Sequence, residues 1–321
     1  MNMTSETSIN PAIRASAPTP ATMIDALNNT FGKHVGKRAS HAKGFCVHGQ
    51  FTPAPDSAQF VSCPLFSTGP MDATARFSVG GGNPGVSDKS RSVRGLAMRV
   101  AGGGESWDLV LISEPVFFAA TPESFVSFLA ARIPDPHTQK PSPEKITAHT
   151  AAYPDGALQP ALLASHAAPL SYATTPYFSN NAFLFKSACG QEQYARIIVT
   201  PVAGTYYLSE EDESNLPDVF LEDEFKARLQ NEPVQFEIVA LLPAETDSLT
   251  DPSQRWAGAG RISLGRLRIT AIAEAGACDG MVFIPVNLPS GIETSEDPIL
   301  LARAAAYGIS LSRRKTVADD M

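Results

Sequence analysis

The sequence has little positive charge and contains no long hydrophobic run. Basic residues number 25 against 33 acidic ones, so the formal net charge is −8. Because contact with a nucleic-acid backbone needs clustered Lys and Arg, a nucleic acid is not an expected partner. No window of about 18 apolar residues occurs, which excludes a helix that spans a bilayer.

Cysteine is also scarce. The four cysteines, Cys46, Cys63, Cys189 and Cys278, are far apart, and none forms a C-x-x-C pair. This spacing excludes the sequence signatures of zinc centres, iron–sulfur clusters and redox dithiols. We expect reduced, mostly buried thiols without a chemical role. The first residues also lack the basic start and apolar stretch of a secretory signal, so we expect a cytoplasmic protein.

Several common catalytic motifs are missing. The sequence lacks G-x-S-x-G, H-E-x-x-H and an EF-hand loop, which excludes the hydrolase, zinc-protease and calcium sites that carry them. Its six histidines include no pair at the helical spacing of metal ligands. The glycine-rich stretch at 80–85 (GGGNPG) lacks the Gly-Lys-Ser/Thr ending of a phosphate loop, so we expect a turn there.

The composition that remains is typical of a folded protein. Hydrophobic residues make up 43% of the 321 residues, and a chain of this length can bury a large core. Residues 1–18 are polar and rich in Ser, Thr, Ala and Pro, so we expect a flexible arm there. Thr19 and Pro20 then predict the N-cap and first turn of a helix, and a second capped helix is expected after Thr121.

Short alternating runs predict antiparallel strands in two blocks. The first block extends from 44 to about 118, with Gly102 to Gly104 as a hairpin turn, whereas residues 134–175 show no convincing period. In the second block, an acidic helix near 216–230 interrupts the strands, and an Ala- and Leu-rich helix begins at 298. An α+β fold is therefore predicted, with an antiparallel barrel or sandwich and peripheral helices. The strands of the second block are expected at 194–200, 235–242, 260–272 and 281–286.

Three separated stretches together resemble the haem-binding core of the catalase family in order and in spacing. Each piece alone is a weak signal, but the ordered set is specific. The match is strong over about residues 35–130 and moderate at 298–315. The matching runs are RASHAKG at 38–44; ARFSV at 75–79 with Asp88 and RGLA at 94–97; WDLV at 107–110 with PVFF at 115–118; and R-x-x-x-Y at 303–307 followed by Arg314.

The resemblance implies a single catalase-like haem-binding domain over residues 19–321. Its expected fold is an antiparallel β-barrel core with peripheral helices and a proximal haem-ligand helix near the C-terminus. Haem is the implied cofactor, and haem b is the expected type. The chain is shorter than ordinary catalases and is similar to the minimal catalase-related peroxidases, so a homodimer is expected by analogy.

The resemblance also implies roles for individual residues. Tyr307 would be the proximal iron ligand, and Arg303, one helical turn earlier, would place a positive charge against the phenolate oxygen. His41 would be the distal acid–base group, with Ser78 as the hydrogen-bond partner that sets its tautomer. The remaining cofactor-binding residues would be Arg38, Arg76 and Arg314 at the haem propionates and Phe125 against the haem face.

One position departs from the family pattern. Where the family usually places an asparagine in G-N-N-x-P, this chain has LISEP at 111–115, so Ile112 occupies that place. An apolar side chain cannot hydrogen-bond a peroxide or orient a second one, and Ser113 is a weak substitute. We therefore expect a peroxidase that reduces hydrogen peroxide or organic hydroperoxides with a small organic electron donor, and that has weak or no catalase activity.

Four other functions stay open at this point. Within haem chemistry, the protein could be a true catalase, or a fatty-acid hydroperoxide isomerase like the related allene oxide synthases. It could also bind haem as a non-catalytic carrier or sensor. The fourth alternative is a β-barrel binding module without haem.

Overall fold

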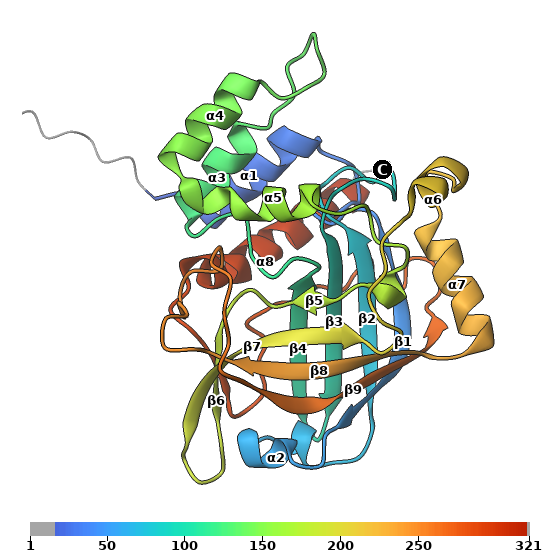
Figure 1. Ribbon diagram of the computed structural model, residues 1–321, viewed down its shortest axis with the longest axis vertical. Helices are drawn as coiled ribbons and strands as arrows, with labels where there is room; N and C mark the ends of the chain where they lie inside the picture. Colours follow the sequence, from blue (N-terminus) through green and yellow to red (C-terminus); the bar gives the residue numbers. More distant parts are fainter. Residues whose placement is uncertain (1–16, 320–321) are drawn as a thin grey trace, which may run out of the picture.

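A closed antiparallel barrel forms the body of the protein (Figure 1). The computed structural model describes residues 17–319, and their side chains as far as residue 315, so nearly all of the arm expected at 1–18 lies outside the described residues. Eight strands pair in a ring, which closes because β8 pairs with both β7 and β9. In ring order they are β7 (Glu192–Pro201), β5 (Tyr177–Phe178), β4 (Glu105–Ile112), β3 (Arg94–Gly102), β2 (Met71–Val79), β1 (Gly44–Pro53), β9 (Gly260–Ile272) and β8 (Val234–Leu242).

Alternation of side chains along the strands fills the barrel. Phe51, Phe77, Trp107 and Phe236 are all fully buried in one hydrophobic cluster, as expected where strands turn every second residue inward. The turn between β3 and β4 is the predicted hairpin, with Gly103 and Gly104 at φ 60° and 81°. Glycine adopts these left-handed angles without strain. Two short strands, β6 (Phe183–Lys186) and β10 (Ile292–Thr294), extend the sheet beside β7.

A layer of helices covers one end of the barrel (Figure 1). The predicted caps of α1 and α3 are confirmed, since the hydroxyls of Thr19 and Thr121 each accept a hydrogen bond from a first-turn backbone N–H. Met23, Leu27, Phe125 and Ile299 from three of these helices share a second hydrophobic cluster. The layer comprises α1 (Pro20–Phe31), α3 (Pro122–Ala130), α4 (Pro143–Ala152), α5 (Leu158–Ala164) and α8 (Pro298–Asp319).

The remaining helices lie elsewhere on the barrel surface. The acidic helix expected near 216–230 is α7 (Leu221–Asn231), and the shorter α6 (Glu210–Asn215) precedes it at the side of the barrel (Figure 1). At the end opposite the helical layer lies α2 (Ser57–Phe60). Among the described residues, no helix is both long enough and apolar enough to cross a membrane. Three short 3-10 helices complete the chain: Pro64–Phe66, Pro154–Gly156 and Tyr172–Thr174.

One prediction about secondary structure was wrong, and one stretch without a predicted element contains two helices. Residues 281–286, expected as a strand, form a loop, because arginine side chains rather than a neighbouring strand bond its carbonyls: Arg38 and Arg314 reach Met281, and Arg99 reaches Val282. The stretch 134–175, which shows no period in the sequence, contains α4 and α5. These two helices are short and bury one polar side chain each, so they need no regular apolar stripe.

The prediction of four reduced, mostly buried thiols was also wrong. Cys46 on β1 and Cys278 in the loop after β9 form a disulfide across 232 residues, with Cα atoms 6.3 Å apart. The other two cysteines are free, Cys63 buried and Cys189 exposed. Antiparallel pairing of β1 with β9 brings the loop back over Cys46, where the N–H of Ala273 donates to the Cys46 carbonyl. This proximity depends on long-range pairing, so cysteine spacing did not reveal it.

Candidate functional site

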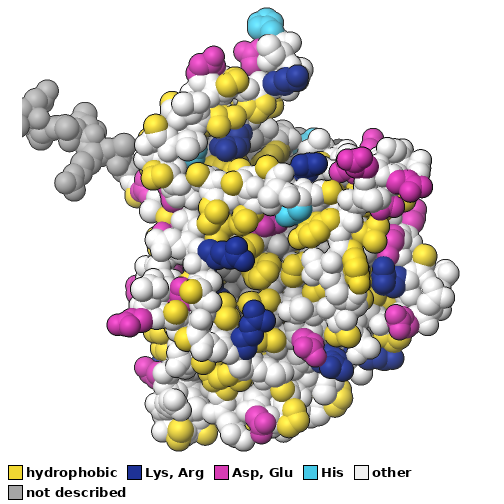
Figure 2. Space-filling view, viewed as in Figure 1, with side chains coloured by type: hydrophobic (Ala, Val, Ile, Leu, Met, Phe, Trp, Pro, Cys, Tyr) yellow, Lys and Arg dark blue, Asp and Glu magenta, His cyan; other side chains and the backbone are white. Residues whose placement is uncertain are grey.

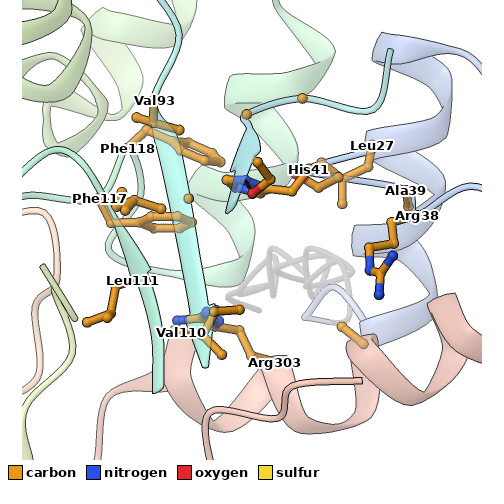
Figure 3. Close-up of a pocket in the computed structure, with 18 of the residues that line it drawn as sticks. Leu27, Arg38, Ala39, His41, Val93, Val110, Leu111, Phe117, Phe118 and Arg303 are labelled. Atoms are coloured by element: carbon orange, nitrogen blue, oxygen red, sulfur yellow. Dashed lines mark hydrogen bonds between the residues drawn. The ribbon is translucent and has the colours of Figure 1, made fainter. Parts of the chain in front are cut away.

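A cavity of about 400 Å3 lies between the end of the barrel and its helical layer (Figure 3). Segments from the whole chain line it: the loop before β1, strands β2 to β4, helices α1 and α3, the loop at 282–283, and α8. Every site residue predicted from the sequence lines this cavity: Arg38, His41, Arg76, Ser78, Phe125, Arg303, Tyr307 and Arg314.

His41 is held in one orientation at the upper side of the cavity (Figure 3). Its Nδ1 lies 2.9 Å from the Ser78 hydroxyl oxygen, as predicted, so Nε2 is the ring nitrogen left for another partner. Gly95 makes this packing possible, because a Cβ there would lie only 2.5 Å from Ser78 Oγ and 2.6 Å from His41 Nδ1. His41 itself has a positive φ of 55°, which is strained for a residue with a side chain.

The surroundings of His41 keep its imidazole neutral. Burial, and after it the positive charges of Arg76, Arg303 and Arg38, together lower its pKa to about 3. Both effects disfavour the charged form. The ring is therefore uncharged at neutral pH and can accept a proton at Nε2.

Tyr307 and Arg303 form the second reactive group of the cavity. They lie one turn apart on α8, and Arg303 Nη2 donates a hydrogen bond to the Tyr307 hydroxyl oxygen at 2.8 Å. The guanidinium carbon is also 5.4 Å from the centre of the tyrosine ring. The contact places a permanent positive charge directly against the phenol oxygen. Figure 3 shows Arg303 and His41 at opposite sides of the cavity.

Two polar residues behind Arg303 were not predicted. Arg303 Nη1 donates to Asn181 Oδ1 at 2.8 Å, and Asn181 Nδ2 donates to Asp297 Oδ2 at 2.6 Å. Asp297 Oδ1 in turn accepts the backbone N–H groups of Ile299 and Leu300, and burial raises the pKa of its carboxyl. The sequence carried one signal, since Asp297 before Pro298 is a helix N-cap pattern. Nothing in the sequence marked Asn181.

Asn180 is a further unpredicted residue. It lines the cavity, is 3% exposed and has a positive φ of 57°. Both polar atoms of its amide are buried without a hydrogen-bond partner among the described residues. Such groups are rare in folded proteins unless a ligand or water pairs with them, so Asn180 marks a polar position in the cavity for a ligand or a water.

Three arginines form a cationic edge of the cavity. Arg38 donates to the carbonyls of Cys278 and Met281 at 2.8 and 3.0 Å, and Arg314 donates to Met281 at 2.9 Å. Arg76 donates to the His41 carbonyl at 3.0 Å. Burial and the charges of Arg76 and Arg314 lower the pKa of Arg38 to about 9, and Arg314 Nε is buried without a partner. None of the described lining residues is Asp or Glu, so this edge suits a ligand with carboxylates.

Aromatic and aliphatic side chains form the other walls. Phe125 on α3 stacks with Phe117 and Phe118, with ring centroids 6.3 and 5.2 Å apart. Ile112 lines the cavity as well. Ser113 does not line it, and its hydroxyl oxygen accepts the N–H of Arg94 at 2.9 Å instead. Ser113 therefore does not replace the polar group that Ile112 lacks.

Comparison with known proteins identifies relatives of nearly the same length. The family model described as catalase matches residues 19–318. A catalase-related peroxidase from Synechococcus elongatus is 34% identical over 304 residues, which cover 94% of this chain and 90% of that protein. One from Mycolicibacterium paratuberculosis is 35% identical, covering 93% and 96%. The crystal structure of a fungal catalase superposes with a TM-score of 0.78 at 21% identity, covering 88% of this chain and 60% of that one.

Proposed function

The chain belongs to the catalase family, and on that premise we propose that it is a haem peroxidase of the catalase-related type. It reduces hydrogen peroxide or an organic hydroperoxide with electrons from a small organic donor. Its catalase activity is weak or absent. The preference for peroxidase over catalase activity rests on Ile112 in the cavity wall and on Ser113, whose hydroxyl bonds the Arg94 N–H and not the cavity.

The residues present fit a haem, and we propose haem b. Tyr307, with Arg303 against its oxygen, is the iron ligand. Arg38, Arg76 and Arg314 hold the two propionates, for which the cavity offers guanidinium groups and no competing described carboxylate. Phe125 packs on the porphyrin face. When bound, the haem iron supplies the redox chemistry that cleaves the peroxide O–O bond and accepts electrons from the donor.

His41 moves the proton in this proposal. Its free Nε2 accepts a proton from one peroxide oxygen and returns it to the other, so that water leaves from hydrogen peroxide and an alcohol from an organic hydroperoxide. Ser78 and Gly95 keep the ring in the orientation that this transfer needs. The low pKa of His41 keeps the ring neutral, and in the tautomer that donates from Nδ1 to the Ser78 hydroxyl, Nε2 is unprotonated when the peroxide arrives.

In this proposal, Ile112 is the reason why the protein has peroxidase activity and little or no catalase activity. Oxidation of a second peroxide to oxygen requires that peroxide to be oriented by hydrogen bonds, and Ile112 offers none. An organic donor that delivers electrons does not need this orientation. The large apolar walls also favour hydroperoxides with an organic group over hydrogen peroxide alone.

The test is a set of assays on the purified, haem-loaded protein. A Soret band shows haem binding, donor oxidation driven by peroxide shows peroxidase activity, and an oxygen electrode measures catalase activity. We expect donor oxidation to exceed oxygen release at low millimolar peroxide. Rapid oxygen release would identify a true catalase, isomerised lipid products an isomerase, and haem binding without turnover a carrier or sensor.

We further propose that residues 19–321 act as one domain, because residues near both ends of this range line one cavity. A homodimer is proposed by analogy with the family. The cytoplasmic location stays a prediction, and the Cys46–Cys278 disulfide weighs against it, since such bonds persist mainly in oxidising compartments. Size-exclusion chromatography with light scattering tests the homodimer, and cell fractionation tests the cytoplasmic location.

A further inference from the structure

A second, much smaller cavity of about 30 Å3, with room for one or two water molecules, adjoins the first at its cationic edge. It lies between the loop at 33–39, helix α1 and the later turns of α8. The two cavities share Arg38, Ala39 and Arg314 in their walls. The surface around the second cavity therefore lies next to the guanidinium groups that, in the proposed function, hold the haem propionates.

The second cavity is strongly cationic, although the chain carries a net charge of −8. Five of its lining residues are Lys or Arg, and none of the described ones is Asp or Glu. Arg313 already pairs with Asp25, at 2.6 Å. Lys33 and Lys37 are exposed, and neither has an ion pair with any described residue. The arginines therefore already have partners, whereas the charges of Lys33 and Lys37 are available to a ligand.

An exposed apolar side chain lies between these two lysines in the loop. Val35 is 52% exposed and lines the cavity. The loop is folded on itself, because the N–H of Lys37 donates to the His34 carbonyl at 3.1 Å and Gly36 has a φ of 68°. Lys33, Val35 and Lys37 thus offer two positive charges around a small apolar surface, which suits an organic anion.

We propose that the exposed surface around the second cavity, formed by Lys33, Val35 and Lys37, binds the electron donor of the peroxidase, and that this donor is a small organic anion. The inference rests on the proposed function. Reducing one peroxide to two waters takes up two electrons and two protons, so two donor molecules are each oxidised by one electron. The donor gives up its electrons from this surface, beside Arg38 and Arg314, and does not enter the main cavity. Peroxide and donor therefore bind at separate places.

The test compares an anionic with a neutral donor in the haem-loaded protein. The anionic donor is the sulfonated dye ABTS, and the neutral one is guaiacol. In the Lys33→Glu/Lys37→Glu variant, we expect kcat/KM for ABTS to fall about tenfold or more, because two attractive charges become repulsive. The value for guaiacol should stay within about twofold. Added salt should weaken ABTS turnover in the wild type and not in the variant.

A matched control and a binding measurement complete the test. Lys140→Glu/Lys145→Glu reverses two exposed lysines that line neither cavity, and it should leave both donors unaffected. Calorimetric titration of ABTS without peroxide should show about tenfold weaker binding to Lys33→Glu/Lys37→Glu than to the wild type. Unchanged ABTS turnover and binding in that variant would overturn the donor site. Failure of the wild type to oxidise either donor would instead overturn the proposed function.

Discussion

Arg303 donates a hydrogen bond to the hydroxyl oxygen of Tyr307 one helical turn away, at 2.8 Å. The same guanidinium also bonds Asn181, which in turn bonds the buried Asp297. Asp297 caps the first turn of α8. A chain of hydrogen bonds therefore connects the N-terminus of α8 to the Arg303 guanidinium, which contacts the Tyr307 oxygen.

The first prediction concerns Asn181. Asn181→Leu keeps the volume but leaves Asp297 Oδ2 and Arg303 Nη1 without their partner. We expect the free energy of unfolding to fall by about 1–3 kcal/mol, the cost of unpaired buried polar groups. Urea denaturation measures this change, and the ferric haem spectrum should shift as Arg303 moves. The exposed Asn215→Leu is the control. An unaltered spectrum would contradict a positioning role for Asn181.

The second prediction concerns the pH dependence of stability. Because the folded state lowers the pKa of His41 to about 3, the folded protein binds fewer protons there than the unfolded chain. The His41 contribution is present above about pH 6.5 and is lost as the pH falls towards 3. We therefore expect His41→Gln to gain stability relative to the wild type on acidification.

The gain should approach about 1.4 kcal/mol per pH unit below pH 6. Urea denaturation of the apoprotein at several pH values measures it, with the exposed His137→Gln as control. A constant difference between His41→Gln and wild type from pH 7 to 4 would show that His41 titrates normally. In the haem-loaded enzyme, His41→Gln should also lose most of its peroxide reactivity, because Nε2 is no longer available as a base.

The third prediction concerns Ile112. Ile112→Asn places a hydrogen-bonding amide in the cavity wall, where it can orient a second peroxide. We expect oxygen release to rise about tenfold or more relative to donor oxidation. Ile112→Leu keeps the wall apolar and should leave the ratio unchanged. The oxygen electrode and the donor assay give this ratio, and an equal ratio in both variants would remove Ile112 as its cause.

The fourth prediction concerns the disulfide. Cys46–Cys278 tethers the loop whose carbonyls receive Arg38 and Arg314. In Cys46→Ala/Cys278→Ala, we expect a loss of about 2–4 kcal/mol in the free energy of unfolding and faster transfer of haem to apomyoglobin. The exposed Cys189→Ala should change neither measurement. Haem retention equal to that of the wild type would show that the loop holds its arginines without the tether.

The strands and capped helices were the most predictable part of the fold. Thr19, Thr121 and the glycine hairpin after Gly102 act through neighbours along the chain, so their patterns could be interpreted locally. The strand expected at 281–286 failed for the opposite reason. Its alternation resembles a strand, but its carbonyls bond the side chains of Arg38, Arg99 and Arg314, whose positions no local pattern contains.

The sequence by itself determined which groups are available for chemistry and the order in which they occur, from Arg38 and His41 to Tyr307 and Arg314. It also determined the departure at Ile112. The tertiary structure decided what surrounds these groups: the disulfide, the Asn181–Asp297 support behind Arg303, and the cationic cavity beside the loop at 33–39. The reason is physical. Helices and turns follow from residues a few positions apart, whereas these contacts join residues brought together only when the barrel closes.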